Sequence, residues 1–261
     1  MSAISQIFVE AKANNRAALI GYWPAGFPSV PASIEIIHAM VAGGVDLIEV
    51  GYPYSDPVMD GPVIQRASES ALAGGFQARD LFSVVEQIKV PTLVMTYWNP
   101  IERYGVSAFA EKLKEVRGVG VITPDLTVEE SEAWIKATTQ SGLDRVYVVA
   151  PSTSNERLAR VLPHCSGFVY AASLMGVTGT RTSVASSARE LVARIKALTD
   201  LPVCVGLGVS NAAQAADVAE FADGVIVGSA FISLVQNTSN EKEACEKVRV
   251  LAAELAQAMK R

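Results

Sequence analysis

The chain contains little of the side-chain chemistry on which many enzymes rely. It has only two histidines, His38 and His164, and neither follows a predicted strand. A Ser-His-Asp or Cys-His nucleophile system is therefore not expected. No carboxylate or histidine cluster has metal-site spacing, and no lysine stands at the end of a predicted strand, where a Schiff base would form. Proton transfer is left to carboxylates and tyrosines.

Cysteines, basic clusters and long apolar runs are also scarce. The three cysteines, Cys165, Cys204 and Cys245, are odd in number and far apart, so we expect buried, reduced thiols and a cytoplasmic protein. A net charge of −5 without a lysine or arginine cluster gives no electrostatic case for nucleic-acid binding. No apolar run reaches the roughly 18 residues that span a bilayer, and the N-terminal segment lacks a signal-peptide core.

Half of the 261 residues are hydrophobic, which suits one large core, and the length is close to the ~250 residues of a (β/α)₈ barrel. Short apolar β-rich runs recur along the chain, as expected for parallel strands covered on both faces. These eight runs are Ala17–Gly21, Leu47–Val50, Thr92–Thr96, Gly120–Ile122, Arg145–Ala150, Gly167–Ala171, Val203–Gly206 and Gly224–Val227. We predict an α/β fold, a single TIM-barrel domain over residues 1–261. An open doubly wound sheet is the alternative, but no short, charged edge strand is visible.

Helical patterns lie between most of these runs. They cover Ser33–Ala42, Leu81–Gln87, Ser107–Val116, Thr127–Ser141, Asn155–Leu162, Ala188–Leu198, Asn211–Glu220 and Glu241–Met259. An extra N-terminal helix is predicted from four apolar residues that share one face: Ile4, Ile7, Phe8 and Ala11. Thr127 and Glu130 form a capping-box pattern, and Ser210 or Asn211 can cap the helix that follows.

The most informative residue is Glu49, which stands in an apolar strand. Side chains two apart on a strand face the same side, so Glu49 points into the space that Leu47 lines, near the strand's C-terminal end. A buried carboxylate must be paired, neutralised or used, and the local sequence offers no basic partner. A satisfied core glutamate or a strand-end salt bridge is the alternative. We interpret Glu49 as catalytic.

Three loops after predicted strands are unusual. Residues 51–65 hold Asp56 and Asp60, and three prolines stiffen the segment: Pro53, Pro57 and Pro62. Both aspartates lie in turn-prone contexts, so turn formation and function stay open for each. Residues 173–187 are rich in glycine, threonine and serine and are expected to move as a lid. Residues 97–100 carry aromatic side chains that suit a planar ligand, whereas Asp125 is interpreted as a structural helix-start residue.

Three glycine motifs predict a phosphate site. They follow the last three strands: Gly176-Val-Thr-Gly179, Gly206-Leu-Gly208 and Gly228-Ser229-Ala230. Glycine lets the backbone approach an anion, and amides at a helix start favour negative charge. Each motif alone is compatible with an ordinary turn. Together they favour a phosphate-bearing substrate, because barrels commonly bind phosphate at the loops after strands seven and eight.

Several motifs resemble those of one known family. Pro53-Tyr-Ser-Asp-Pro-Val-Met-Asp-Gly-Pro-Val-Ile-Gln65 is similar to the signature loop of the tryptophan synthase alpha subunit. Met95-Thr-Tyr-Trp-Asn-Pro100, Pro124-Asp-Leu-Thr-Val-Glu-Glu130 and the three glycine motifs resemble its other segments, in the same order. The resemblance implies a TIM barrel that cleaves indole-3-glycerol phosphate to indole and glyceraldehyde 3-phosphate. It also implies an α2β2 assembly, in which the beta subunit carries pyridoxal phosphate and this chain needs no cofactor.

The resemblance also assigns residues. It implies that Glu49 is the general acid–base and Asp60 the second catalytic carboxylate. Positions implied to contact the substrate or its phosphate are Tyr170, Thr178, Gly179, Gly208, Gly228 and Ser229. Positions implied to face the beta subunit are Pro53, Asp56 and Asn99. The chain departs from the family pattern at residues 24–28, at Met59 and at residues 174–175, and none of these departures replaces either carboxylate.

Other functions remain open at this point. The chain could act mainly as a regulatory subunit with slight activity of its own, or as a stand-alone lyase that releases indole. Another phosphate-binding barrel is a further alternative. An indole-glycerol-phosphate synthase needs a strand-end lysine, however, and a triose isomerase needs a catalytic histidine, and the sequence provides neither.

Overall fold

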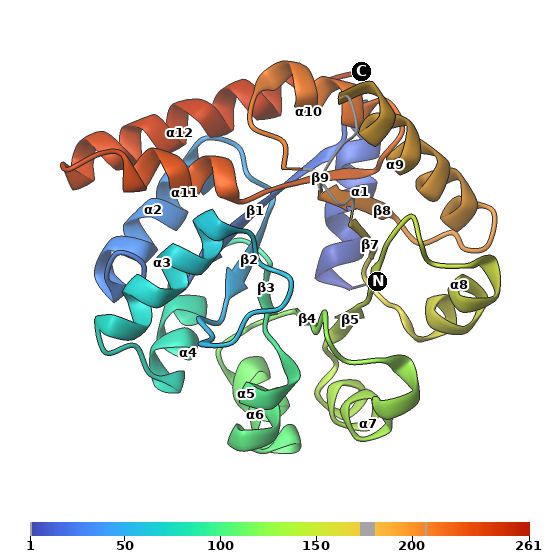
Figure 1. The fold of residues 1–261 in the computed structure, drawn as a ribbon, viewed down its shortest axis with the longest axis horizontal. Coiled ribbons are helices and arrows are strands. Elements are labelled where there is room, and N and C mark those ends of the chain that lie inside the picture. The colour runs from blue at the N-terminus through green and yellow to red at the C-terminus, as the bar shows by residue number, and fades with distance from the viewer. Residues whose placement is uncertain (1, 173–180, 207) are drawn as a thin grey trace.

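The strands of this chain form a parallel sheet that nearly closes into a barrel, with the helices arranged around it (Figure 1). The computed structural model describes residues 2–172, 181–206 and 208–261. Its strands are β1 (Ala18–Pro24), β2 (Leu47–Gly51), β3 (Thr92–Met95), β4 (Gly120–Ile122), β5 (Asp144–Val146), β6 (Val148–Val149), β7 (Val169–Ala172), β8 (Val203–Gly206) and β9 (Gly224–Val227). The spatial order is β5-β4-β3-β2-β1-β9-β8-β7-β6.

The described strands number nine rather than eight because the predicted run Arg145–Ala150 is divided at Tyr147. Its first part, β5, pairs with β4, and its second part, β6, pairs with β7. The two ends of the sheet are therefore consecutive in the chain, which nearly closes the barrel. The Tyr147 carbonyl also accepts a hydrogen bond from the Tyr170 N–H at 3.1 Å. The (β/α)₈ prediction is confirmed.

Helices connect and surround the strands. Those in the described part of the chain are α1 (Ala3–Ala13), α2 (Val30–Ala42), α3 (Pro62–Ala73), α4 (Ala78–Gln87), α5 (Trp98–Tyr104), α6 (Val106–Glu115), α7 (Glu132–Ser141), α8 (Asn155–Val161), α9 (Arg181–Lys196), α10 (Ala212–Ala219), α11 (Ser229–Gln236) and α12 (Glu241–Ala258). Two short 3₁₀ turns, η1 (Val128–Glu130) and η2 (Leu162–His164), precede α7 and follow α8.

Some helix boundaries differ from the prediction. The pattern Thr127–Ser141 is not one helix, because the chain forms η1 and leaves helical geometry at Ser131 (φ −93°, ψ 9°) before α7 begins. The Thr127 side chain makes no cap hydrogen bond, so the capping box there is wrong. The cap at Asn211 is confirmed, since its side chain accepts the Gln214 N–H at 3.0 Å. Helices α3, α5 and α11 were not predicted, and they shorten the expected loops.

The apolar core has two layers, one between strands and helices and one inside the barrel. The interior layer includes the predicted apolar face of α1: Ile4, Ile7, Phe8 and Ala11. Phe8 packs edge-on against Phe168, with ring centroids 5.9 Å apart. A Cβ atom at Gly167, just before β7, would lie 3.2 Å from the side chain of Ile4. Helix α1 therefore covers the N-terminal end of the barrel, and the opposite end remains for a site.

The cysteine prediction needs a correction. Cys204 is buried in the barrel interior, but Cys165 and Cys245 are only partly buried, because they lie outside that layer. All three are free thiols. Within the described segments, we find no helix whose length and apolarity would allow it to cross a membrane.

Candidate active site

Glu49 lies inside the barrel, as strand alternation predicts. Its side chain is fully buried on β2, on the same interior side as Leu47. Neither carboxylate oxygen has a hydrogen-bond partner among the described residues. Burial raises the pKa of Glu49 from an ordinary 4.5 to about 8, since a charged carboxylate is poorly solvated there. No residue that the structure describes pairs with Glu49 as the salt-bridge alternative requires, and at neutral pH Glu49 is mainly a neutral proton donor.

A cavity of about 460 Å³ opens at the C-terminal end of the barrel. Residues of six strands and of the segment after β2 line it, including Tyr22, Asp60, Met95, Tyr170, Gly208 and Ser229. Glu49 is not among the lining residues, but it is the register partner of Tyr22 on β1, which lines the cavity. Burial, Asp60 and Glu49 all raise the pKa of Tyr22. The cavity therefore brings Tyr22, Asp60 and Glu49 into one electrostatic environment.

Two tyrosines flank this environment because neighbouring strands end in glycine. A Cβ atom on Gly51 would lie 2.3 Å from the Tyr22 hydroxyl, and one on Gly206 would lie 2.4 Å from the Tyr170 hydroxyl. Tyr170 lines the cavity, as the resemblance implies. Tyr22 was missed by the sequence reasoning. The sequence feature that could have identified Tyr22 is its position on the first strand. It lies two residues after Ile20, so both side chains face the barrel interior.

Asp60 and Asp56 occupy different surroundings on the segment between β2 and α3. The half-buried Asp60 lines the cavity. Burial raises its pKa, and a hydrogen bond from the Tyr97 hydroxyl opposes that rise. Asp56 is exposed, and its carboxylate accepts a hydrogen bond from Ser55 Oγ at 2.5 Å. Only Asp60 is placed for chemistry in the cavity.

The residues expected to face a partner are also placed. Asp56 and Asn99 are exposed, whereas Pro53 is buried in this chain. Two apolar side chains on the Asp56 segment are exposed as well, Val58 at 78% and Met59 at 48%. Large exposed apolar side chains on one loop are typical of a surface that another protein covers.

Part of the expected phosphate site lies within the described residues. Gly208, Gly228 and Ser229 line the same cavity as Asp60. Helix α11 begins at Ser229 with Gly228 as its N-cap, and no side chain caps its first amides in the described structure. Uncapped amides at a helix N-terminus form an anion site. Gly208 has φ +65°, a backbone conformation that favours glycine. Thr178 and Gly179 lie outside the described residues, as does most of the expected lid.

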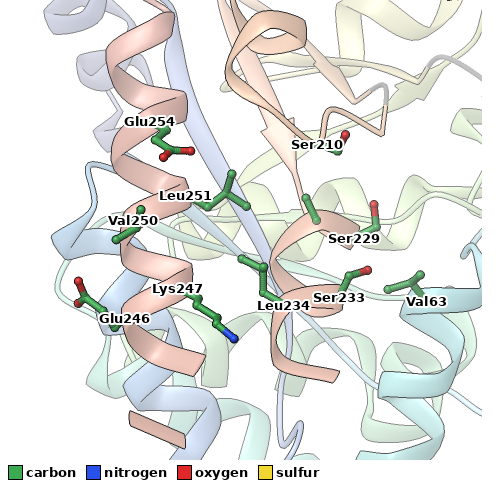
Figure 2. A pocket seen from close by; sticks show the side chains of 11 residues that line it. Val63, Ser210, Ser229, Ser233, Leu234, Glu246, Lys247, Val250, Leu251 and Glu254 are labelled. Carbon is green, nitrogen blue, oxygen red and sulfur yellow. The ribbon is translucent and has the colours of Figure 1, made fainter. Parts of the chain in front are cut away.

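A second hollow, of about 650 Å³, lies between α11 and α12 on the outside of the barrel (Figure 2). Figure 2 shows Lys247 extending from α12 toward α11, while Ser229 lies at the start of α11. This groove shares only Val63 and Ser229 with the mouth cavity, and neither catalytic carboxylate candidate lines it. It therefore adjoins the candidate site at Ser229 but does not reach the two carboxylates.

The remaining candidates have structural roles. Asp125 is structural, as expected, but it serves another helix, since its carboxylate accepts the Trp98 N–H at the start of α5 (2.9 and 3.1 Å). The Trp98 ring packs on Trp134 with centroids 5.9 Å apart rather than lining the cavity, so the expected aromatic platform is wrong there. The His38 ring bonds the Gln87 carbonyl at 3.1 Å. Over the described ranges, no group of histidine, cysteine and carboxylate residues could hold a metal ion.

The fold and site define a class, a TIM barrel with a buried carboxyl, a second carboxylate and an uncapped helix start at the C-terminal end of its strands. A family model described as "Tryptophan synthase alpha chain" matches residues 8–260. The chain belongs to the tryptophan synthase alpha chain family.

Individual relatives agree with this assignment. The tryptophan synthase alpha chain of Thermobifida fusca is 56% identical over 262 residues, covering 98% of this chain and 97% of that one. The Streptomyces avermitilis alpha chain is 55% identical over 261 residues, covering 98% and 94%. Among solved structures, Mycobacterium tuberculosis tryptophan synthase is 50% identical, with a TM-score of 0.92 and coverage of 100% and 99%. The Legionella pneumophila subunit alpha is 34% identical, with a TM-score of 0.90 and coverage of 99% and 98%.

Proposed function

We propose that this chain is the alpha subunit of a tryptophan synthase, a lyase that cleaves indole-3-glycerol phosphate to indole and glyceraldehyde 3-phosphate. The observation that carries the proposal is the fully buried Glu49, unpaired among the described residues, whose register partner Tyr22 lines the same cavity as Asp60. A neutral carboxylic acid and a second carboxylate at one cavity supply the two charge states that a retro-aldol cleavage needs.

The pKa of Glu49 sets the order of the proton transfers. With a pKa of about 8, Glu49 begins as the neutral acid and delivers its proton to indole C3. The resulting carboxylate then accepts the proton of the adjacent side-chain hydroxyl. The electrons of that O–H bond form the aldehyde carbonyl, and those of the C–C bond restore the indole ring. Glu49 ends protonated, so the cycle consumes no proton.

Asp60 has the complementary task. When C3 is protonated, positive charge develops at the indole N–H, and an anionic Asp60 that accepts a hydrogen bond from it stabilises this charge. The Tyr97 hydrogen bond favours that anionic state by lowering the pKa of Asp60. Tyr170 contacts the substrate between the two carboxylates in this proposal.

The phosphate of the substrate is assigned to the other side of the cavity. The backbone amides at Gly208, Gly228 and Ser229 would hold it at the start of α11, together with Gly179 and the lid residue Thr178. A cavity of about 460 Å³ is within the usual size for a small-molecule site. Binding energy at the phosphate would fix the indole between the carboxylates.

We assign the exposed segment that carries Asp56, Val58 and Met59, with Pro53 and the exposed Asn99, to contact with a beta subunit in an α2β2 assembly. The exposed apolar side chains support this assignment. Indole would pass to that subunit, where pyridoxal phosphate supplies the chemistry that joins it to serine. This chain would need no cofactor of its own, and the assembly would be cytoplasmic.

The test is an indole-release assay with indole-3-glycerol phosphate, with and without the beta subunit. The chain should cleave the substrate alone and faster in the complex. Glu49→Gln should lose cleavage by ~10²–10⁴-fold, the usual contribution of general acid–base catalysis, and should still bind the beta subunit. Asp60→Asn should be impaired as well. A purely regulatory subunit would show no cleavage in either condition, and a stand-alone lyase would not respond to the beta subunit.

A further inference from the structure

Tyr97 connects three loops at the mouth of the barrel. It follows β3, its side chain is buried, and it reaches the segment between β2 and α3, while the next residue is held by the loop after β4. We propose that Tyr97 is a positioning residue that fixes Asp60 in place and keeps it anionic, and that Asp125 in turn fixes Tyr97. The proposal rests on the proposed function, in which Asp60 is catalytic.

The first contact joins Tyr97 to the backbone beside Asp60. The Met59 N–H donates a hydrogen bond to the Tyr97 hydroxyl oxygen at 3.0 Å. An oxygen that accepts this bond still has its own proton to donate, and the hydroxyl lowers the pKa of the nearby Asp60 carboxylate. One hydroxyl therefore holds the main chain at Met59 and favours the anionic form of Asp60.

A ring contact holds the earlier part of the same segment. Tyr54 and Tyr97 pack with ring centroids 5.2 Å apart, so Tyr97 contacts the segment near both of its ends. Apart from Gln65, whose side chain donates to the Asp60 carbonyl at 2.8 Å, the described hydrogen bonds that reach residues 59–60 from outside the segment come from Tyr97. The Tyr97 hydroxyl and the Gln65 amide thus hold the main chain on either side of the Asp60 side chain.

Asp125 supports Tyr97 from the opposite side. Helix α5 begins at Trp98. Its N-cap residue is Tyr97, whose side chain makes no cap hydrogen bond to the helix. The carboxylate of Asp125 fulfils this role through two contacts with the Trp98 N–H. An acidic group at a helix N-terminus stabilises the first turn, which fixes the backbone from which Tyr97 projects.

These contacts predict an electrostatic effect as well as a mechanical one. Burial raises the pKa of Asp60, and the Tyr97 hydroxyl lowers it. Burial in turn raises the pKa of Tyr97 to about 12, so its hydroxyl keeps the proton over the working pH range. Removing this hydroxyl should leave Asp60 protonated, and hence inactive, at pH values where the unaltered chain is active.

The test is Tyr97→Phe in the full chain, with Tyr104→Phe as the matched control. Tyr104 loses the same atom from an aromatic cluster at the far end of α5. Tyr97→Phe should lower kcat on the order of 10- to 100-fold, the range for a hydrogen bond to a charged group, with a smaller change in KM. The acid limb of its pH profile should move to higher pH, because the group that lowers the pKa of Asp60 is removed. Tyr104→Phe should match the unaltered chain.

Asp125 provides the second arm of the test. Asp125→Ala should move the same acid limb in the same direction by a smaller amount, and Asp125→Asn, which keeps an acceptor oxygen, should restore it. In the double variant with Tyr97→Phe, the effect of Asp125→Ala should largely disappear, because both act through one hydroxyl.

Two readouts do not depend on activity. Hydrogen exchange of the Met59 amide should accelerate in Tyr97→Phe and not in Tyr104→Phe, and the carboxyl titration of Asp60, followed by NMR, should move upward. An unchanged pH profile and an unchanged Met59 exchange rate in Tyr97→Phe would overturn the proposal. Absence of cleavage by the unaltered chain would instead refute the proposed function, and the NMR and exchange measurements would still test the support of Asp60 by Tyr97.

Discussion

Replacing Glu49 with glutamine should stabilise the protein while it abolishes catalysis. Glu49 is fully buried, and neither of its oxygens is hydrogen-bonded to a described residue. Its pKa is about 8 in the folded chain and 4.5 when solvated. Between these two pH values the folded state binds a proton that the unfolded state has released, so the free energy of unfolding falls as pH rises.

The magnitude follows from the two pKa values of Glu49. They differ by about 3.5, which corresponds to about 5 kcal/mol of lost stability once the pH is above both. At pH 7 the loss is about 3 kcal/mol, because roughly 2.5 pH units above 4.5 have been crossed. Glutamine is neutral at every pH and has nearly the same shape. Its advantage should therefore be close to zero at about pH 4.5 and grow until about pH 8.

The assay is the melting temperature of Glu49→Gln and of the unaltered chain between about pH 5 and pH 9. At pH 7 the variant should melt roughly 6–12 °C higher, because a chain of this size gains about 2–4 °C per kcal/mol. Glu69→Gln removes the same charge from an exposed position on α3 and should show no such pH-dependent difference. A melting difference for Glu49→Gln that stays flat across this range would refute the reasoning.

The other predictions concern activity. Cleavage should follow a bell-shaped pH profile that falls on the alkaline side near pH 8, because Glu49 must be protonated, and on the acid side as Asp60 gains a proton; a rate that stays level through pH 8 in steady-state assays would contradict the Glu49 assignment. Gly206→Ala should lower kcat, since the new methyl group would lie 2.4 Å from the Tyr170 hydroxyl and displace that ring; retained activity with an unmoved ring in a crystal structure would be the opposite result. Ser229→Asp should raise KM far more than it lowers kcat, because a negative charge at the start of α11 repels phosphate; an unchanged KM would place the phosphate elsewhere.

The parts of this structure that the sequence predicts depend on local patterns. Apolar runs identify the strands, and strand alternation alone places Glu49 with Leu47 inside the barrel. The apolar face of α1 follows from helical spacing in the same way. These features depend on neighbours within a few residues, where the chain constrains its own geometry.

The parts that escaped prediction depend on contacts between distant segments. Tyr22 reaches the cavity only because Gly51, on the neighbouring strand, leaves room for its hydroxyl. The bond from the Met59 N–H to the Tyr97 hydroxyl joins residues 38 apart. The strand break at Tyr147 depends on pairing with two distant strands. The first half of the run, β5, pairs with β4, and the second half, β6, pairs with β7. No local pattern encodes any of these.

The depth at which Glu49 lies in the barrel determines how far its pKa is raised. Leu47 lies two residues earlier on β2, at the preceding interior position. It belongs to the fully apolar layer above α1, where a carboxyl would have no access to substrate. At the strand's end, a carboxyl nearer to solvent would keep a pKa close to 4.5 and would be ionised at neutral pH. Glu49 lies two residues beyond Leu47, and its register partner on β1, Tyr22, lines the cavity. Burial there raises the pKa enough to keep the proton while the acid stays next to the residues that would hold the substrate. The instability expected of Glu49 and its proposed use as an acid therefore have one physical cause, the loss of solvation of its carboxylate.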